Sequence, residues 1–275
     1  MAIDISQLAL PHVSPEGFRA LSIISEAEPN IAELQAVILK DPVLAGMLVR
    51  HANSPLFRRN RTVTNVPGAI RVLGLKSIRN AIIMATLNSQ PVTNKSGQPI
   101  WEHSMAVSMA ARIIAERIEP QACDDLEFLG LIHDTGMLVF ASNFPEEYSA
   151  LLQQAVSEHY AVDKLEPEVF GLQHSIVMAR FLEQFRLPTH LIDLLVNFHS
   201  HTSMDHIETS DRRHLLILDL SHYLLARIDQ EHLTPYPETI VEPLEVVQES
   251  LGVDDQLLEE LKQAIASHLT NNQPD

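Results

Sequence analysis

The sequence predicts an all-α protein, and two observations carry that expectation: its composition and the spacing of its apolar residues. Only 9 of the 275 residues are glycine and 5% are aromatic, while Leu, Ile and Ala are frequent. This balance favours helices over strands. The long segments repeat apolar residues at helical spacing, without the alternation of a strand and without a repeat of fixed period. We therefore expect about thirteen helices.

The first third of the chain contains the clearest helix starts. Ser14-Pro15 and Asp41-Pro42 each place a capping side chain before a proline suited to the first helical position. Gly74 is expected to interrupt two helices, and the polar, basic segment 56–66 to form an irregular loop. The helices expected in this part cover residues 15–28, 31–38, 42–53, 67–73 and 76–87.

Residues 88–99 read NSQPVTNKSGQP, and their Ser, Asn, Pro and Gly indicate a linker. We expect it to separate an N-terminal helical subdomain at 1–95 from a second helical subdomain at 96–275. Because the linker is short, the two are expected to pack together rather than swing freely. The helices expected beyond it cover residues 102–118, 124–140, 145–158, 166–185, 189–198, 212–228, 243–250 and 254–268.

Composition also bounds the location of the protein. Cys123 is the single cysteine, which excludes an intrachain disulfide and favours a reducing compartment. The N-terminus has no basic signal region, and no apolar run approaches the ~20 residues that span a bilayer. We therefore expect a cytoplasmic protein without a membrane partner.

The charge of the chain is strongly negative and unevenly distributed. A net charge of −17 argues against nucleic acid as a partner, because phosphate contacts need clustered Lys and Arg. Basic residues nevertheless gather within thirty positions, namely Arg50, Arg58, Arg59, Arg61, Arg71, Lys76 and Arg79. One interpretation is a solvated basic face, and the other is a docking surface for an acidic partner.

Several polar residues lie on the apolar face or at the C-terminal end of their expected helices. They are His103, His133, Asp134, His174, His199 and Asp219. A single histidine in such a place is more often a satisfied core residue than a ligand. Together, imidazole and carboxylate groups in this number suit Fe, Mn, Zn, Co or Ni, as one or two ions. The spacing of one helix does not reveal whether the other helices converge on it.

Other chemistries find no support in the sequence. The chain has no glycine-rich phosphate loop and no GxSxG, Cys123 has no recognisable catalytic context, and we expect no organic cofactor. His222 shares a helix face with Asp219 inside the apolar run LLILDLSHYLL. Most remaining histidines are interpreted as surface residues, with His201 and His206 as weaker neighbours of the candidate site.

The stretch ILKDPVLAGMLVRHANSPLF at 38–57, with VPGAI and LG after it, resembles the N-terminal signature of the HDOD proteins. These form the "HD-related output domain" family of bacterial signalling. The similarity continues through WEHSMAVSMAARIIAE, FLGLIHDTGMLVF, EPEVFGLQHSIVMARFLEQFRLP and LLVNFHSH, and so covers nearly the whole chain.

The resemblance implies an HD-domain-like fold, related to HD-type phosphohydrolases and to the HD-GYP phosphodiesterases of cyclic di-GMP. In those enzymes a first His, an HD pair and a later Asp bind one metal, and further histidines bind a second. By position, His103, His133, Asp134 and Asp219 resemble the first set. His174 and His199 resemble the additional ligands.

Departures from the enzymes argue against ordinary hydrolysis. HD-GYP enzymes carry HDxGK, and here Met137 stands where that Lys would approach the substrate phosphate and stabilise its charge. Their paired HH reads His199-Ser200, and the GYP segment is missing. The resemblance also implies that this chain is an output or regulatory module, because HDOD proteins are generally treated as modules without demonstrated catalysis.

We therefore favour a non-catalytic signalling module that binds a signalling protein partner and holds a structural or sensory metal. The alternative is a metal-dependent phosphohydrolase acting on a nucleotide or cyclic dinucleotide, with Asp134 in its catalytic centre. A third interpretation is that the ligand positions are vestigial.

Overall fold

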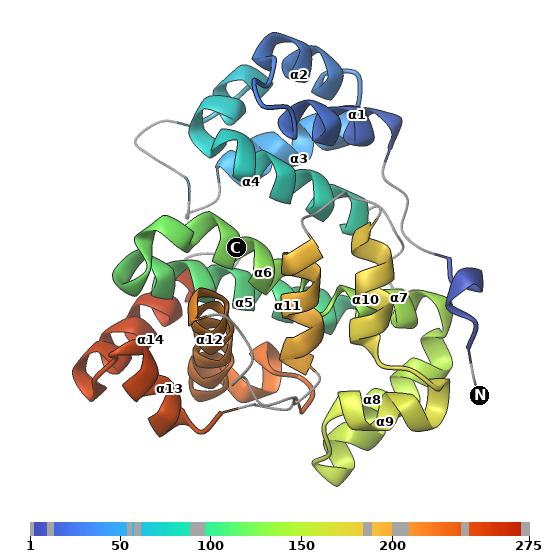
Figure 1. Cartoon of the computed structure of the whole chain (residues 1–275), viewed down its shortest axis with the longest axis vertical. Helices are drawn as coiled ribbons and strands as arrows, with labels where there is room; N and C mark the ends of the chain where they lie inside the picture. Colours follow the sequence, from blue (N-terminus) through green and yellow to red (C-terminus); the bar gives the residue numbers. More distant parts are fainter. Residues whose placement is uncertain are drawn as a thin grey trace. The chain divides into compact units, whose positions relative to one another are not determined.

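The structure is a computed structural model that describes residues 3–9, 14–53, 57, 62–88, 97–183, 189–199, 209–237 and 242–270. These residues form helices α1 to α14 and two short 3-10 helices, and they contain no strand (Figure 1). The expectation of an all-α fold is thereby confirmed. Within the described ranges, every helix is too short or too polar to cross a membrane.

The chain divides into two compact units, Pro11–Pro91 and Met1–Leu10 with Val92–Asp275. The first residues belong to the second unit rather than to the N-terminal subdomain expected from the sequence. The backbone N–H of Ile3 donates to the carbonyl of Phe170 at 3.0 Å, and that of Ala9 to Oδ1 of Asn143 at 2.8 Å. The expected boundary between 95 and 96 lies outside the described residues.

The unit Pro11–Pro91 is a small helical bundle whose starts carry the expected caps. Ser14 Oγ accepts from the N–H of Gly17 and donates to Oδ2 of Asp41, which joins the beginnings of two helices. Gly74, at φ 73°, interrupts the last helix as expected. Much of the expected loop 56–66, with Arg58, Arg59 and Arg61, lies outside the described residues. The helices are α1 (Pro15–Ile24), α2 (Ile31–Ile38), α3 (Pro42–Ala52) and α4 (Val66–Asn88).

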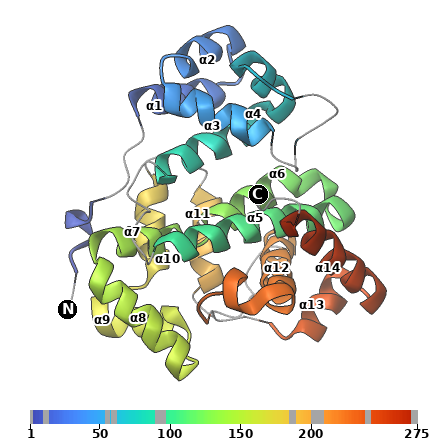
Figure 2. The same ribbon diagram turned by 180° about the vertical axis from the view of Figure 1, so that it is seen from behind.

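In the second unit, helix α5 is the central element, and α6, α7, α12 and α14 pack around it (Figures 1 and 2). The 3-10 helices are η1 (Ile5–Gln7) and η2 (Pro120–Ala122). The α-helices are α5 (Gly97–Ile118), α6 (Cys123–Ile132), α7 (Thr135–Asn143), α8 (Pro145–Glu158), α9 (Val162–Phe170), α10 (His174–Leu182), α11 (Thr189–His199), α12 (Thr209–Leu233), α13 (Leu244–Leu251) and α14 (Asp255–Thr270).

Two helices expected to be continuous are each broken in two. The expected helix 124–140 ends at Ile132 and restarts at Thr135, because Asp134 leaves helical dihedrals (φ −108°, ψ 17°). The expected helix 166–185 is interrupted after α9, because Gly171 adopts the left-handed conformation (φ 82°) that commonly ends helices. Both breaks lie next to candidate site residues, so they determine how the site is built.

Candidate metal centre

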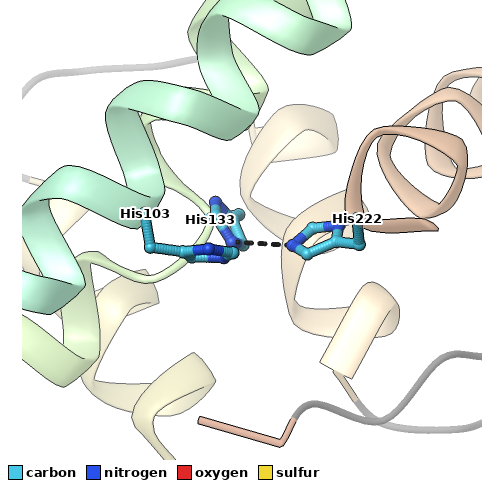
Figure 3. A group of neighbouring side chains, drawn as sticks. All are labelled: His103, His133 and His222. Atoms are coloured by element: carbon cyan, nitrogen blue, oxygen red, sulfur yellow. Dashed lines mark hydrogen bonds between the residues drawn. The ribbon is translucent and has the colours of Figure 1, made fainter. Parts of the chain in front are cut away.

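Three histidines converge in the core of the second unit. His103 of α5, His133 at the end of α6 and His222 of α12 offer ring nitrogens that all lie within 4.8 Å of one another (Figure 3). The three side chains are almost wholly buried, and His222, at 4%, is the most exposed. Nε2 of His133 lies 3.3 Å from Nε2 of His222.

Main-chain oxygens orient the three rings. The Nδ1–oxygen pairs are His133 with Gly130 (2.7 Å), His222 with Leu218 (2.7 Å) and His103 with Leu233 (2.5 Å). A carbonyl oxygen only accepts, so each Nδ1 carries a proton and Nε2 of the neutral ring keeps its lone pair. Metal-binding histidines are oriented in this way, with one nitrogen held by the protein and the other facing the ion.

The separation of Nε2 in His133 and His222 fits a shared cation. Two lone pairs 3.3 Å apart repel each other unless a proton or a metal ion lies between them. Two ligands about 2.1 Å from a tetrahedral ion would stand roughly 3.4 Å apart. The donor set is therefore the right kind, and at the right spacing, for a divalent metal that prefers imidazole.

Asp134 connects this cluster with a fourth histidine. Its Oδ2 lies 3.2 Å from Nε2 of His133 and 3.9 Å from Nε2 of His103, and it accepts from the hydroxyl of Tyr236 at 3.0 Å. Its Oδ1 lies 3.6 Å from Nε2 of His174. The carboxylate is fully buried, so its charge is compensated inside the protein by these polar neighbours.

His174 is held differently from the other three rings. Its Nδ1 and its backbone N–H both lie 2.7 Å from Oε2 of Glu166, and Oε1 of Glu166 accepts from the hydroxyl of Tyr148 at 2.6 Å. Burial lowers the pKa of His174, but the negative charges of Glu166 and Asp134 outweigh it and raise that pKa to about 9. Burial and the charge of Glu166 also raise the pKa of Tyr148.

Two glycines let the helices that carry the site approach closely. A Cβ at Gly130 would lie 2.9 Å from the backbone of Ser108, so α6 packs directly on α5 and brings His133 toward His103. A Cβ at Gly136 would lie 1.9 Å from the carbonyl oxygen of His174, so α7 touches the start of α10. Neither contact has room for a side chain.

The structure brings four of the six residues singled out from the sequence together: His103, His133, Asp134 and His174. Asp219 is buried on α12, one turn before His222, but it is not part of the three-histidine group. The side chain of His199, like His201 and His206, lies outside the described residues. Met137 is buried at 1% exposure.

Sequence reasoning missed His222, Glu166 and Tyr236. The sequence pattern could have indicated His222, because it shares a helix face with Asp219, but Asp219 was chosen as the candidate ligand of that face. The indication for Glu166 was weak. It lies eight residues before His174, and an unbroken helix would have placed the two residues about two turns apart. Tyr236 follows the end of α12, and nothing in its sequence context points to Asp134.

Comparison with known proteins identifies the family of this chain. Residues 10–201 match the HDOD domain family. The chain belongs to the HDOD family. An uncharacterised protein of Treponema pallidum (strain Nichols) is 23% identical over 181 residues, which are 64% of this HDOD chain but only 34% of the relative. The chain therefore spans about a third of the length of the curated protein that it matches.

Solved structures share the fold over nearly the whole HDOD chain. An HDOD domain protein of unknown function from Geobacter sulfurreducens has a TM-score of 0.73 at 21% identity, covering 97% of this chain and 92% of that one. A candidate signal transduction protein from Marinobacter aquaeolei VT8 has 0.71 at 20% identity, with coverages of 95% and 58%. A candidate phosphohydrolase from Shewanella amazonensis SB2B has 0.68 at 17% identity, with coverages of 96% and 91%.

Proposed function

We propose that this HDOD chain is a non-catalytic signalling module that binds a divalent metal through His103, His133 and His222, with Asp134 beside them. The observation that carries the proposal is the buried pair of Nε2 atoms in His133 and His222, 3.3 Å apart, with both Nδ1 atoms bound to carbonyls. A cation between them removes the repulsion of their lone pairs. His174, on the other side of Asp134, is the candidate ligand for a second ion.

Burial supports a structural or sensory metal over a catalytic one. His103, His133 and Asp134 have no exposed surface, and Met137, which stands at the motif position of the lysine in HD-GYP enzymes, is 1% exposed. Phe198 adds an apolar wall, with its ring centroid 6.5 Å from that of His133 and 5.9 Å from that of His222. A site closed to solvent in this way suits a metal ion that stabilises the fold or senses a signal, rather than one that activates water.

The two units differ in charge, and this supports a protein partner for the first. Residues 11–91 hold nine basic and five acidic side chains, whereas the rest of the chain holds ten basic and 31 acidic. Large apolar side chains are also exposed there, including Leu39 at 59% and Val43 at 62%. We propose that this unit binds an acidic signalling protein, since complementary charge steers association.

A metal-dependent phosphohydrolase is the second candidate. It is favoured by the donor set, because three histidines leave a coordination position open, as in catalytic zinc sites. In that case the substrate would be a nucleotide or a cyclic dinucleotide, and Asp134 would stand beside the open position.

Metal analysis of the chain purified without chelator tests the proposal. We expect one or two ions of Fe, Mn, Zn, Co or Ni per chain, and their loss in His133→Ala. His268→Ala is the matched control, because its Nδ1 also contacts a carbonyl four residues earlier, on α14, at 3.0 Å. Absence of metal in the purified chain, with no binding on titration, would overturn the proposal.

Activity assays then separate the two candidates. The metal-loaded chain is incubated with cyclic dinucleotides and nucleoside phosphates. We expect no turnover above the level of His133→Ala. Metal-dependent hydrolysis that His133→Ala abolishes would replace the signalling module by the phosphohydrolase.

A further inference from the structure

Glu166 is a buried carboxylate whose two oxygens both have partners. Oε1 accepts from the hydroxyl of Tyr148 at 2.6 Å, and Oε2 accepts from Nδ1 and from the backbone N–H of His174, each at 2.7 Å. The side chain has no exposed surface. A buried carboxylate is costly unless its hydrogen bonds are made, and here they all converge on one histidine and the tyrosine behind it.

The position of His174 in its helix explains why a side chain, rather than a main-chain carbonyl, accepts from its Nδ1. Nδ1 of His133 contacts the carbonyl three residues earlier, and Nδ1 of His222 the carbonyl four residues earlier, both within their own helices. His174 is the first residue of α10 and has no preceding helical turn. Its ring therefore requires an acceptor from another element, and Glu166 of α9 supplies it.

We propose that Glu166 is the positioning residue of His174, and that Tyr148 fixes Glu166. Through Nδ1, Glu166 turns the ring so that Nε2 faces Oδ1 of Asp134 at 3.6 Å. Through the backbone N–H it also caps α10, whose N-cap residue Gln173 makes no side-chain cap. One carboxylate thus sets both the helix start and the direction of the imidazole.

Tyr148 is itself fixed by aromatic packing. Its ring centroid lies 5.5 Å from that of Phe140 and 5.9 Å from that of Phe170, and those two rings stack at 4.8 Å. Tyr148, Phe140 and Phe170 come from α8, α7 and α9, so the hydroxyl reaches Glu166 from a rigid base. The predicted role is orientation, and Glu166 itself is not a ligand.

The inference rests on the proposed metal site for its effect on affinity, but the ring orientation can be measured without metal. The first measurement is Co²⁺ affinity by titration, with the Co²⁺ absorption spectrum. We expect Glu166→Ala to weaken binding of the ion that His174 would hold by roughly 10- to 100-fold, as is typical when the partner of a ligand is removed. Glu166→Gln keeps an oxygen acceptor of the same reach, and we expect it to restore binding to near the native value.

Glu127→Ala is the matched control. Glu127 is also buried, at 4% exposure, but its carboxylate pairs with Arg112 instead of a histidine of the candidate site. We expect this variant to lose stability and keep its Co²⁺ affinity. Equal loss of affinity in Glu127→Ala and Glu166→Ala, or native affinity in Glu166→Ala, would overturn the inference.

The second measurement is the ¹⁵N spectrum of His174 in the metal-free chain, which keeps the inference separate from the proposed function. Glu166→Gln and Tyr148→Phe preserve the shape of the native side chains, so they can be used even if Glu166→Ala does not fold. We expect both to alter the signal of Nδ1 of His174 and to leave the signals of His133 and His222 in place. If the chain binds no metal, the proposed function fails and this spectrum alone decides the inference. If the His174 signal is unchanged in both Tyr148→Phe and Glu166→Ala, the carboxylate only caps the helix. If Glu166→Ala does not fold, an unchanged signal in Tyr148→Phe and Glu166→Gln leads to the same conclusion.

Discussion

The histidines around Asp134 are held in two different ways. His103, His133 and His222 place Nδ1 against main-chain carbonyls, whereas His174 places it against the carboxylate of Glu166. A carbonyl fixes the direction of a ring without adding a full charge, but a carboxylate also favours its protonated form. The pKa of His174, about 9, reflects that difference. The same residue type is thus held by main-chain carbonyls on one side of Asp134 and by a second carboxylate on the other.

The largest expected effect comes from replacing one histidine of each kind by alanine and comparing the losses in metal affinity. His222→Ala should weaken metal binding by more than the roughly 10- to 100-fold typical of outer partners, because it removes a direct donor. His174→Ala should have the smaller effect on the first ion, since Asp134 lies between that ion and His174. Calorimetric titration of Zn²⁺ into both variants measures this. Equal losses would show that the four histidines form one set.

A smaller effect is expected at the contact that places His174 beside Asp134. Gly136→Ala would set a Cβ 1.9 Å from the carbonyl oxygen of His174, so α7 and α10 must separate. We expect a loss of about 1–3 kcal/mol in the free energy of unfolding, as for other overpacked sites. Urea unfolding measures it.

Gly46→Ala is the matched control for this substitution. Gly46 lies in α3, and a Cβ there would meet nothing within 4 Å. Alanine should therefore stabilise the helix by about 0.5–1 kcal/mol. A similar stability change in the two variants would show that the contact between α7 and α10 is not tight.

The last effect concerns a buried carboxylate whose partner is an arginine instead of a histidine. Burial raises the pKa of Glu127 from 4.5 to about 7, because Arg112 is shared with Asp124 and Glu116 and does not offset the loss of water. A raised carboxyl pKa means that the folded state holds the proton more tightly than the unfolded state. Its stabilising contribution is therefore complete below pH 4.5 and is lost as the pH rises through 7.

Stability measured against pH tests this. We expect the free energy of unfolding of the native chain to fall by about 3 kcal/mol relative to Glu127→Gln between pH 4.5 and 8. The difference between the two chains isolates Glu127 from the histidines that titrate in the same range. A difference that stays constant with pH would mean that Arg112 fully compensates the carboxylate.

The sequence was informative wherever a residue's own helix decides its environment. The caps at Ser14 and Asp41 form as predicted, and the break at Gly74 is present. His103, His133 and His174 are buried as their helix faces indicate. The HDOD resemblance, which rests on contiguous residues, is confirmed by the family match.

The sequence was wrong where the backbone breaks inside a continuous apolar pattern. Apolar spacing runs unbroken across His133-Asp134, yet α6 ends at Ile132 and α7 begins at Thr135, with Asp134 in non-helical dihedrals between them. Glu166 then appears on the far side of a second break, at Gly171, and no helix periodicity relates it to His174. The break at Gly171 follows from its left-handed conformation, whereas helical spacing alone gives no sign of the break at Asp134.

What the sequence alone determined is therefore the all-α class, the family and the buried faces of the candidate ligands, since these follow from spacing and motifs along single segments. Only the tertiary structure decided that His222 joins His103 and His133, and that Tyr236 and Glu166 hold Asp134 and His174. Helical periodicity fixes the direction of a side chain about its own axis. The point where several axes meet depends on close contacts between helices, such as those at Gly130 and Gly136.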